Sequence, residues 1–236
     1  MSFIHRDPSK KTLLYLGGSN GHGLISILTT VNPPFNDVHV FEANKQCYDK
    51  LVAVLNPGVN KFIKITYGAV SDDSHKSHIT FYNCTDPEGN TLHKDGSSSL
   101  GLIDHTWHND YKQFKMNEVT VPCIYLPRYC EEHNILHIDT YLSDIQGSDL
   151  KVLKTMREYL RKKLIINIQC EVTKDGKHNI YKTLPSNEER DFNTLLYPSG
   201  YRLVSRGWVC GILKPGEFKE VDPEWWEQDL LWSRVT

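Results

Sequence analysis

The feature that most constrains the fold is a cluster of glycines between an apolar run and a helix-like run. Thr12 to Leu16 is apolar and strand-like, and the next seven residues, Gly17 to Gly23, contain four glycines. Residues 24–30 then have a helix-like pattern. Glycines let the chain turn tightly and let a ligand approach the backbone, and the start of the helix offers free N–H groups to an acceptor. The segment predicts a nucleotide-type site, although plain connections also use glycines.

An acidic residue at the end of the next strand-like run strengthens this prediction. Val38 to Phe41 is apolar and is followed by Glu42, 25 residues after Gly17. Doubly wound folds place an acid there, where it accepts hydrogen bonds from ribose hydroxyls. The alternative is a strand-end glutamate that faces water. NAD(P) and S-adenosylmethionine (SAM) both suit this arrangement. The glycines do not follow the Gly-x-Gly-x-x-Gly order of dinucleotide sites, which weakens the pyrophosphate interpretation, whereas SAM has no phosphate and looser requirements.

Strand-like and helix-like runs alternate along the rest of the chain, which predicts an α/β fold with a mostly parallel sheet. The clearest helix has one apolar face, made by Leu150, Leu153, Met156 and Leu160. We expect a single domain over 1–236 with a SAM-binding core at about 12–205. The expected helices are 24–30, 46–55, 148–163 and 188–197, and the expected strands are 12–16, 38–41, 62–67, 79–82, 119–126, 136–145, 164–168, 201–205 and 208–213.

The stretch 83–118 has no regular pattern, and we expect it to form a substrate-side loop, since long structureless connections in compact domains are often functional. It contains Asp104, His105, Trp107 and His108. A histidine there is a candidate general base, because its ordinary pKa is about 6.5. Asp104 and Trp107 are candidate substrate contacts. An ordinary surface loop is the competing interpretation, and a metal site is a third that the loose spacing does not favour.

The composition restricts the partners and the compartment. A formal net charge of −2 gives no sign of nucleic acid binding. No apolar run approaches the roughly 18 residues that a membrane span needs, and the polar N-terminus lacks the apolar region of a secretory signal. We therefore expect a cytoplasmic protein, or one of a host cytoplasm, with no membrane partner. The six cysteines include no Cys-x-x-Cys pair, so we expect no metal site.

Four segments, in the right order, resemble the FkbM family of SAM-dependent methyltransferases. Residues 16–21 are similar to the loop Asp-x-Gly-Ala-Asn-x-Gly of that family, and residues 38–44 to its Phe-Glu-Pro-Asn strand end. Residues 68–72 are similar to its Ala-x-Ser-Asp, and residues 138–147 to its Lys-x-Asp-x-Glu/Gln-Gly segment. Tyr15 stands where the family usually has the aspartate of the loop.

The resemblance implies a Rossmann-like class I methyltransferase with a seven-stranded, mostly parallel sheet. It implies that SAM lies across the carboxyl ends of the strands. It also implies an acceptor such as a sugar hydroxyl on a glycan. The cofactor-binding residues that we predict are Gly17, Gly18, Ser19, Asn20, Gly21, His22, Glu42, Ala43, Ala69, Val70, Asp144 and Gln146.

Three acidic or basic side chains are candidates for the chemistry of methyl transfer to oxygen, which requires alignment of the acceptor and removal of its proton. Asp144 closes a strand beside the expected cofactor and is our first candidate for the general base. It could instead orient SAM or cap the following turn. Glu171 could bind an acceptor hydroxyl or face water, and His22 could touch the ligand or cap its helix.

The C-terminal segment 215–236 is expected to form a tail that contains Trp225, Trp226 and Trp232. Tryptophan faces stack on sugar rings, but packing on the domain or a homodimer contact is the more frequent use. The leading function is a SAM-dependent O-methyltransferase. The alternatives are an NAD(P)-dependent oxidoreductase and a non-catalytic binding protein on the same fold.

Overall fold

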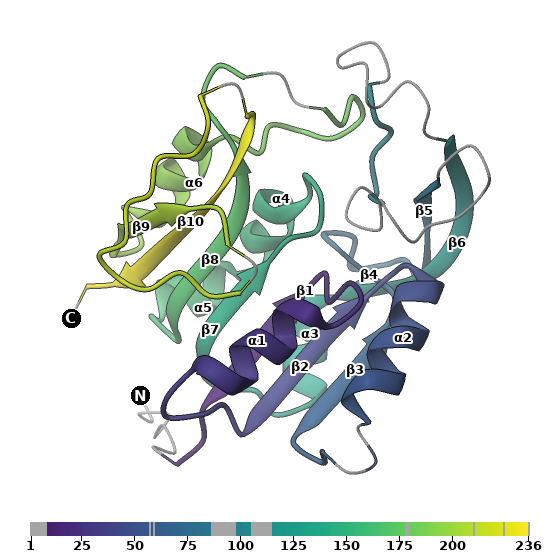
Figure 1. The fold of residues 1–236 in the computed structure, drawn as a ribbon, viewed down its shortest axis with the longest axis horizontal. Coiled ribbons are helices and arrows are strands. Elements are labelled where there is room, and N and C mark those ends of the chain that lie inside the picture. Colours follow the sequence, from purple (N-terminus) through teal and green to yellow (C-terminus); the bar gives the residue numbers. More distant parts are fainter. Residues whose placement is uncertain are drawn as a thin grey trace.

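The computed structural model describes residues 9–56, 58, 60–85, 98–104, 115–177, 180–209, 211–223 and 225–235. Its main sheet has seven strands in the order β3-β2-β1-β7-β8-β10-β9 (Figure 1). Their bounds are β1 Thr12–Leu16, β2 Asp37–Glu42, β3 Ile63–Tyr67, β7 Ile138–Ser143, β8 Ile165–Thr173, β9 Tyr201–Gly207 and β10 Glu227–Arg234. A smaller sheet has the order β4-β6-β5, with β4 Ala69–Ser71, β5 His78–Thr85 and β6 Lys115–Tyr125.

The first five strands of the main sheet are parallel, as the sequence predicts. β1 pairs in parallel with β2 and β7, β2 with β3, and β7 with β8. Only β10 is antiparallel, both to β8 and to β9. The carboxyl ends of β1, β2, β3, β7 and β8 therefore meet at one edge of the sheet, and ligands of such folds bind at this edge.

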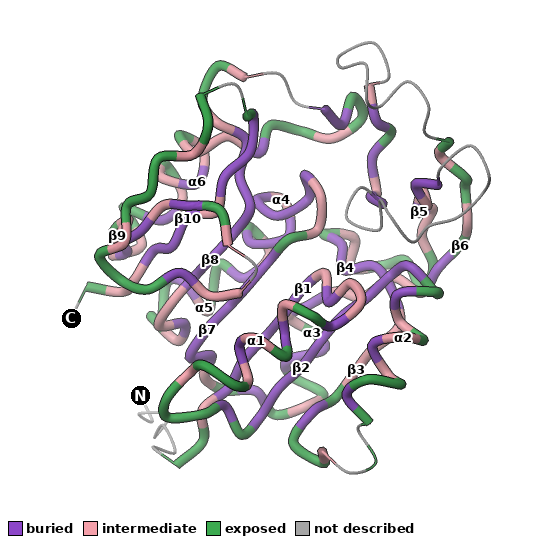
Figure 2. The backbone as a smooth tube through the Cα atoms, in the orientation of Figure 1, coloured by how far each residue is buried: buried purple, intermediate pink, exposed green. Residues whose placement is uncertain are grey.

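Helices cover both faces of the main sheet. They are α1 His22–Thr30, α2 Lys45–Leu55, α3 Leu126–Glu132, α4 Asp149–Leu153, α5 Arg157–Arg161 and α6 Glu189–Leu196. Alternate residues of β1 separate the two cores: Leu13 and Tyr15 pack with α1 and α2, whereas Leu14 and Leu16 pack with α3 to α6. The central strands β1, β2 and β7 are accordingly buried along their whole length (Figure 2). This two-sided burial explains their nearly continuous apolar sequences.

The expected helix 148–163 is interrupted. α4 and α5 are separated by a 3-10 turn, Lys154–Met156. The predicted apolar face survives this change, because Leu150, Leu153, Met156 and Leu160 are all at most 1% exposed. The sequence analysis missed the short elements β4 and α3.

The expected strand 208–213 is wrong. Its backbone groups bond to side chains instead of a neighbouring strand: Gln169 donates to the Gly211 carbonyl and accepts from Leu213 N, at 2.9 and 2.8 Å. Val209 N donates to Asp229 at 2.9 Å. The last strand is β10, which lies within the segment expected to form a tail and is inserted between β8 and β9.

The stretch 83–118 is also more regular than expected. β5 reaches Thr85 and β6 begins at Lys115, and the two pair antiparallel from His78↔Pro122 to Thr85↔Lys115. Between them, Ser98 to Asp104 returns to the smaller sheet, where Ser99 bridges Tyr82. His105, Trp107 and His108 lie outside the described residues. In the part of the chain that the structure describes, none of the helices has the length and apolar character needed to cross a membrane.

Candidate active site

The glycine-rich loop brings the ends of β1, β2 and β7 together. Gly17 N and Gly18 N both donate to the Phe41 carbonyl at 3.0 Å. Gly17 has φ +84°, and a Cβ there would lie 1.9 Å from the Asp144 carbonyl oxygen. A Cβ on Gly18 would lie 2.6 Å from a Val40 methyl group. These contacts require glycine at both positions and hold the loop against the strand end that carries Asp144.

Glu42 lies at the carboxyl end of β2 with both oxygens directed to backbone N–H groups. Its carboxylate accepts from Ser19 N at 2.7 Å and from Asn44 N at 2.6 Å. Burial raises the pKa of Glu42 to about 7, although these hydrogen bonds act in the opposite direction. Because a carboxylate oxygen has more than one acceptor position, Glu42 can still accept from a ligand hydroxyl.

A first cavity of about 70 Å³ opens beside Glu42. Its apolar lining residues, which include Phe41, Ala43 and Val70, suit a flat aromatic ring. Ser148 is fully buried, and among the described residues its Oγ has no hydrogen-bond partner. Such an unsatisfied group is suited to a ligand. The cavity is lined by Gly17, Ser19, Phe41, Glu42, Ala43, Gly68, Ala69, Val70, Phe81, Ser98, Leu100, Asp144, Ile145, Gln146 and Ser148.

A second cavity of about 210 Å³ lies on the other side of the same loop. It shares Gly17, Ser19 and Asp144 with the first cavity, so a ligand with two parts can occupy both. Its other lining residues are Tyr15, Gly18, Asn20, His22, Gly23, Leu142, Gln169, Val209, Gly211 and Asp229. Gly21 lines neither cavity: it precedes α1 with φ +88°, and a Cβ there would touch Leu51.

Two carboxylates meet at the wall between the sheet and the first cavity. Gln146 Nε2 donates to Asp144 Oδ1 at 2.7 Å and to Glu171 Oε2 at 3.0 Å. Gln146 itself has φ +55°, an unusual backbone conformation for this residue type. Tyr181 Oη donates to Gln146 Oε1 at 2.5 Å, which fixes the orientation of the amide. These hydrogen bonds therefore hold the Asp144 and Glu171 carboxyl groups in place.

The two carboxyl groups differ in acidity. Solvent reaches Asp144, yet protein surrounds it on most sides, and this loss of hydration raises its pKa. Glu171 is only 9% exposed; burial, and then the charge of Asp144, raises its pKa well above the ordinary value. Asp144 consequently loses its proton first, and it is the stronger candidate for a general base near neutral pH.

Further buried carboxyl groups surround this pair. Burial raises the pKa of Asp149 and of Asp229 to about 7 and that of Glu227 to about 8, and the Asp144 charge adds to each shift. Within the described ranges, no group of three or more His, Cys, Asp or Glu side chains is arranged to hold a metal ion. The buried carboxyl groups make this edge of the sheet acidic, and an acidic environment favours a bound cation.

The predicted site residues divide into three groups. Eight of them line the first cavity, and Gly18, Asn20 and His22 line the second. Asp104 and Glu171 line neither of these cavities: Asp104 forms an ion pair with Lys182 at 2.9 Å, and Glu171 accepts from Gln146 at 3.0 Å. The sequence analysis missed Phe81, Ser98, Leu100, Ser148, Gln169 and Asp229. Phe81, Ser98 and Leu100 come from or beside the smaller sheet, and no local sequence signal marks them.

The comparison with protein families decides the identity of the fold. The model of the methyltransferase FkbM domain matches residues 35–194, more than half of the chain. The chain belongs to the FkbM methyltransferase family. The FkbM family is a family of SAM-dependent methyltransferases, so SAM is the cofactor that this family uses, and the NAD(P) alternative is set aside.

One solved structure of an FkbM methyltransferase supports the fold. The chain is similar to an FkbM methyltransferase from Methylobacillus flagellatus, with a TM-score of 0.50 and 11% identity over 98% of this chain. It spans 45% of the length of that protein. It is also similar to Aeropyrum pernix fibrillarin with bound SAM (TM-score 0.45, 13% identity, 98% of this chain and 70% of that one). A third match is the N-terminal domain of EvdMO1 with SAH and D-fucose (0.44, 8%, 97% and 78%). No curated protein matches the sequence.

The residues of this FkbM methyltransferase fit SAM. Glu42 would accept from the ribose hydroxyls, and the apolar walls beside Ala43 and Val70 would contact the adenine. Ser148 Oγ, which has no hydrogen-bond partner among the described residues, offers a further contact in the same cavity. In the second cavity, the Asp229 carboxyl group would face the ammonium group. Tyr15, which replaces the usual loop aspartate, lines that cavity too, so Asp229 would supply the missing negative charge.

Proposed function

We propose that the chain transfers the methyl group of SAM to a hydroxyl group of a sugar. The observation that carries the proposal is the Asp144–Gln146–Glu171 cluster. Asp144 lines both cavities around the glycine loop, Gln146 lines the first, and Glu171 is bonded to Gln146 beside them. SAM supplies an electrophilic methyl group when bound. The adenosine would occupy the first cavity and the amino-acid part the second, and the sulfonium would then lie near Asp144.

Asp144 would act as the general base. Gln146 engages Oδ1, and Oδ2 is the oxygen that Gln146 leaves to accept the hydroxyl proton. The Gln146 amide and the Tyr181 hydroxyl hold the carboxylate during this transfer. Glu171, which keeps its own proton longer, can donate to or accept from a neighbouring hydroxyl of the acceptor.

A sugar acceptor is supported by the chemistry of the cleft and by the family resemblance. Two carboxyl groups and an amide within one hydrogen-bonded cluster match the closely spaced hydroxyls of a sugar ring. Among the described residues that line the two cavities there is neither Lys nor Arg, so these residues offer no counter-charge for an anionic acceptor. The neutral or cationic acceptor that this predicts includes ordinary hexoses, 6-deoxyhexoses and amino sugars.

Mass spectrometry with trideuteromethyl SAM tests the proposal. The protein is incubated with a panel of methyl glycosides and the matching di- and trisaccharides of glucose, galactose, mannose, rhamnose and N-acetylglucosamine. We expect a mass increase of one labelled methyl group on at least one saccharide. Fragmentation should place the label on oxygen, and the Asp144→Asn variant should not form the product. Labelling of nitrogen, or no labelling despite SAM binding, would contradict O-methylation of a sugar.

A further inference from the structure

Three tryptophans form a continuous aromatic wall at the carboxyl edge of the main sheet. The rings of Trp225 and Trp226 stack with centroids 4.2 Å apart and an interplanar angle of 26°. Trp208 meets Trp225 edge-on at 5.0 Å and 76°. Exposure increases along the wall, from 5% at Trp226 to 36% at Trp225 and 50% at Trp208. The outer two rings therefore present their surfaces to solvent, although the inner ring is buried.

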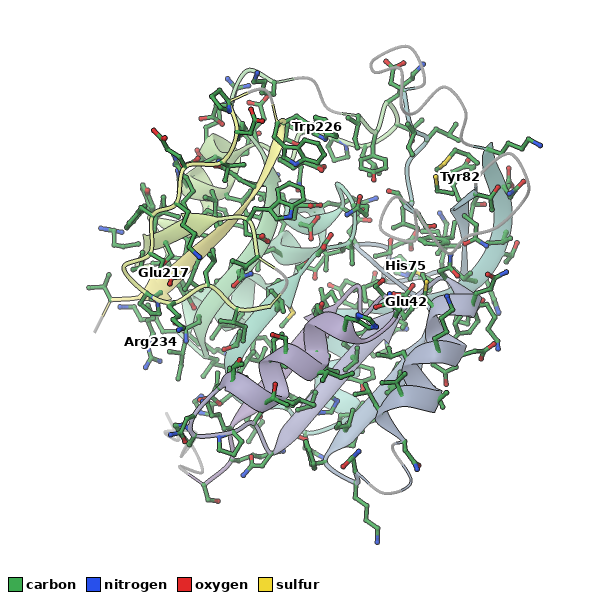
Figure 3. All side chains as sticks on the ribbon, viewed as in Figure 1. Glu42, His75, Tyr82, Glu217, Trp226 and Arg234 are labelled. Atoms are coloured by element: carbon green, nitrogen blue, oxygen red, sulfur yellow. The ribbon has the colours of Figure 1, made fainter. Side chains whose placement is uncertain are left out.

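The inner end of the wall connects to the candidate base. Trp226 packs in one buried cluster with Tyr181, Ile103, Ile180 and Cys84. Tyr181 in turn donates to Gln146, and Gln146 donates to Asp144 and Glu171. In Figure 3, Trp226 lies at the start of β10, well above Glu42, which ends β2.

The register of β10 places the outer rings beyond the carboxyl cluster. Asp229 pairs with Glu171, and Glu227 pairs with Thr173. Trp225 precedes Glu227 by two residues, so at about 3.3 Å per strand residue it lies up to about 13 Å beyond the level of Glu171. This is more than one sugar ring spans, so a sugar at Trp225 would be a further ring of an acceptor held at Asp144.

Exposed tryptophan faces beside carboxyl groups have the chemistry of a saccharide subsite. The apolar face of a sugar ring packs on indole, and its hydroxyl groups bond to carboxylates at its edge. Trp232, the remaining tryptophan of the C-terminal segment, is fully buried against Phe192, so burial was available to this part of the chain. Two adjacent solvent-facing indoles at the active edge therefore point to a ligand.

We infer that Trp225 and Trp208 form a distal acceptor subsite, which binds the sugar ring next to the one that is methylated. The acceptor is then an oligosaccharide or a glycan end, not a free monosaccharide. This inference rests on the proposed function, since it assumes a saccharide at Asp144.

The test compares chain lengths in the full-length protein. The wild type, Trp225→Ala and Trp208→Ala are assayed with trideuteromethyl SAM on the mono-, di- and trisaccharides of the panel above. Phe62→Ala is the matched control, an aromatic residue that is 40% exposed next to the amino end of β3. Saturation-transfer NMR of the same saccharides with the SAH-loaded protein gives a binding readout without turnover. Trp225→Phe keeps a ring in case alanine destabilises the stack.

We expect the wild type to favour di- and trisaccharides over the monosaccharide by about tenfold in kcat/KM, which corresponds to about 1.4 kcal/mol. Trp225→Ala should remove this advantage, and Trp225→Phe should keep part of it. Monosaccharide turnover should not change, and Phe62→Ala should keep the wild-type advantage.

Saccharide methylation with no dependence on length or on Trp225 would overturn the subsite and leave the proposed function intact. If no saccharide is methylated, the proposed function fails. In that case, Trp225-dependent NMR binding of disaccharides supports the subsite, and its absence overturns it. A change from dimer to monomer in Trp208→Ala with unaltered saccharide binding would also overturn it, in favour of a subunit contact.

Discussion

Single carboxyl groups dominate the chemistry of this cleft, and their protonation depends on what they contact. Glu42 is 8% exposed and has two backbone N–H partners, yet burial still raises its pKa to about 7. Ribose hydroxyls that donate to Glu42 would stabilise its charged form. The charge of Glu42 and the binding of SAM should therefore be coupled.

The first prediction concerns Glu42→Gln. The amide keeps the size of the side chain but removes the charge, and an amide NH₂ replaces one of the acceptors of the Ser19 and Asn44 N–H groups. Hydrogen bonds to charged groups contribute about 1.5–3 kcal/mol, so we expect the Kd for SAM to rise by roughly tenfold or more. Isothermal titration calorimetry measures it, with Glu132→Gln on the exposed surface of α3 as the control.

Calorimetry at several pH values adds a sharper criterion. SAM prefers the ionised Glu42, so wild-type binding should strengthen as the pH rises from 6 to 8, through a pKa of about 7. This dependence should be flatter in Glu42→Gln. Equal affinities and equal pH profiles for the two proteins would mean that Glu42 does not hold the ribose.

The second prediction concerns Asp144→Asn. The amide cannot take a proton, so we expect kcat to fall by about 10²-fold or more while the Kd for SAH changes far less. In the wild type, kcat should rise with pH as Asp144 ionises, at a pH above the ordinary range for aspartate because crowding by protein raises its pKa. Asp49→Asn on the surface of α2 is the control. A pH-independent rate, or full activity of Asp144→Asn, would remove Asp144 from the role of base.

At the scale of elements, the loop between β1 and α1 fixes the site because it joins three strand ends. The sequence predicts this part well, since an apolar run, glycines and a strand-end acid are local signals. It predicts β10 poorly: the strand starts with Glu227 and Gln228, which are buried although they are polar, and with Asp229, which is half-buried. Their burial depends on partners far away in the sequence. Phe81, Ser98 and Leu100 are hard to predict from the sequence for the same reason, because the smaller sheet brings them to the cavity.

The third prediction separates the effect of the left-handed backbone at Gly17 from the effect of its close contact with Asp144. Gly17→Ala combines a positive φ of +84° with a Cβ only 1.9 Å from the Asp144 carbonyl, whereas Gly176→Ala has φ +75° and no atom within 4 Å. The left-handed conformation alone costs an alanine about 1–2 kcal/mol. Gly176→Ala should lose about that much stability in urea unfolding and keep SAM binding. Gly17→Ala should lose more and bind SAM weakly. Equal losses, with SAM binding intact, would show that the close contact between β1 and β7 does not matter.

For the whole molecule, the notable property is the number of buried carboxyl groups at one edge of the sheet. Glu227, Asp149 and Asp229 have pKa values raised to between about 7 and 8, mainly by burial. In the unfolded chain these groups titrate near 4. Between these limits the native protein holds more protons than the unfolded chain, and its stability then falls as the pH rises.

The fourth prediction follows from this decrease of stability with rising pH. The contribution of these groups is fully present below about pH 4 and is lost as the pH rises through 7 to 8. The Tm of the ligand-free protein should therefore fall by at least about 5 °C between pH 5.5 and 8.5, as a few kcal/mol implies for a chain of this length. Differential scanning calorimetry measures it. Glu227→Gln should flatten the curve, and a Tm that rises over this range would refute the assignment.

The crystal structure of the protein with SAH tests the central claim most directly. We expect density for SAH along both cavities around the glycine loop, with the ribose hydroxyls at Glu42, the adenine beside Ala43 and Val70, and the sulfur near Asp144. Density for SAH at another place, or a cleft without SAH in crystals grown at saturating concentration, would contradict it.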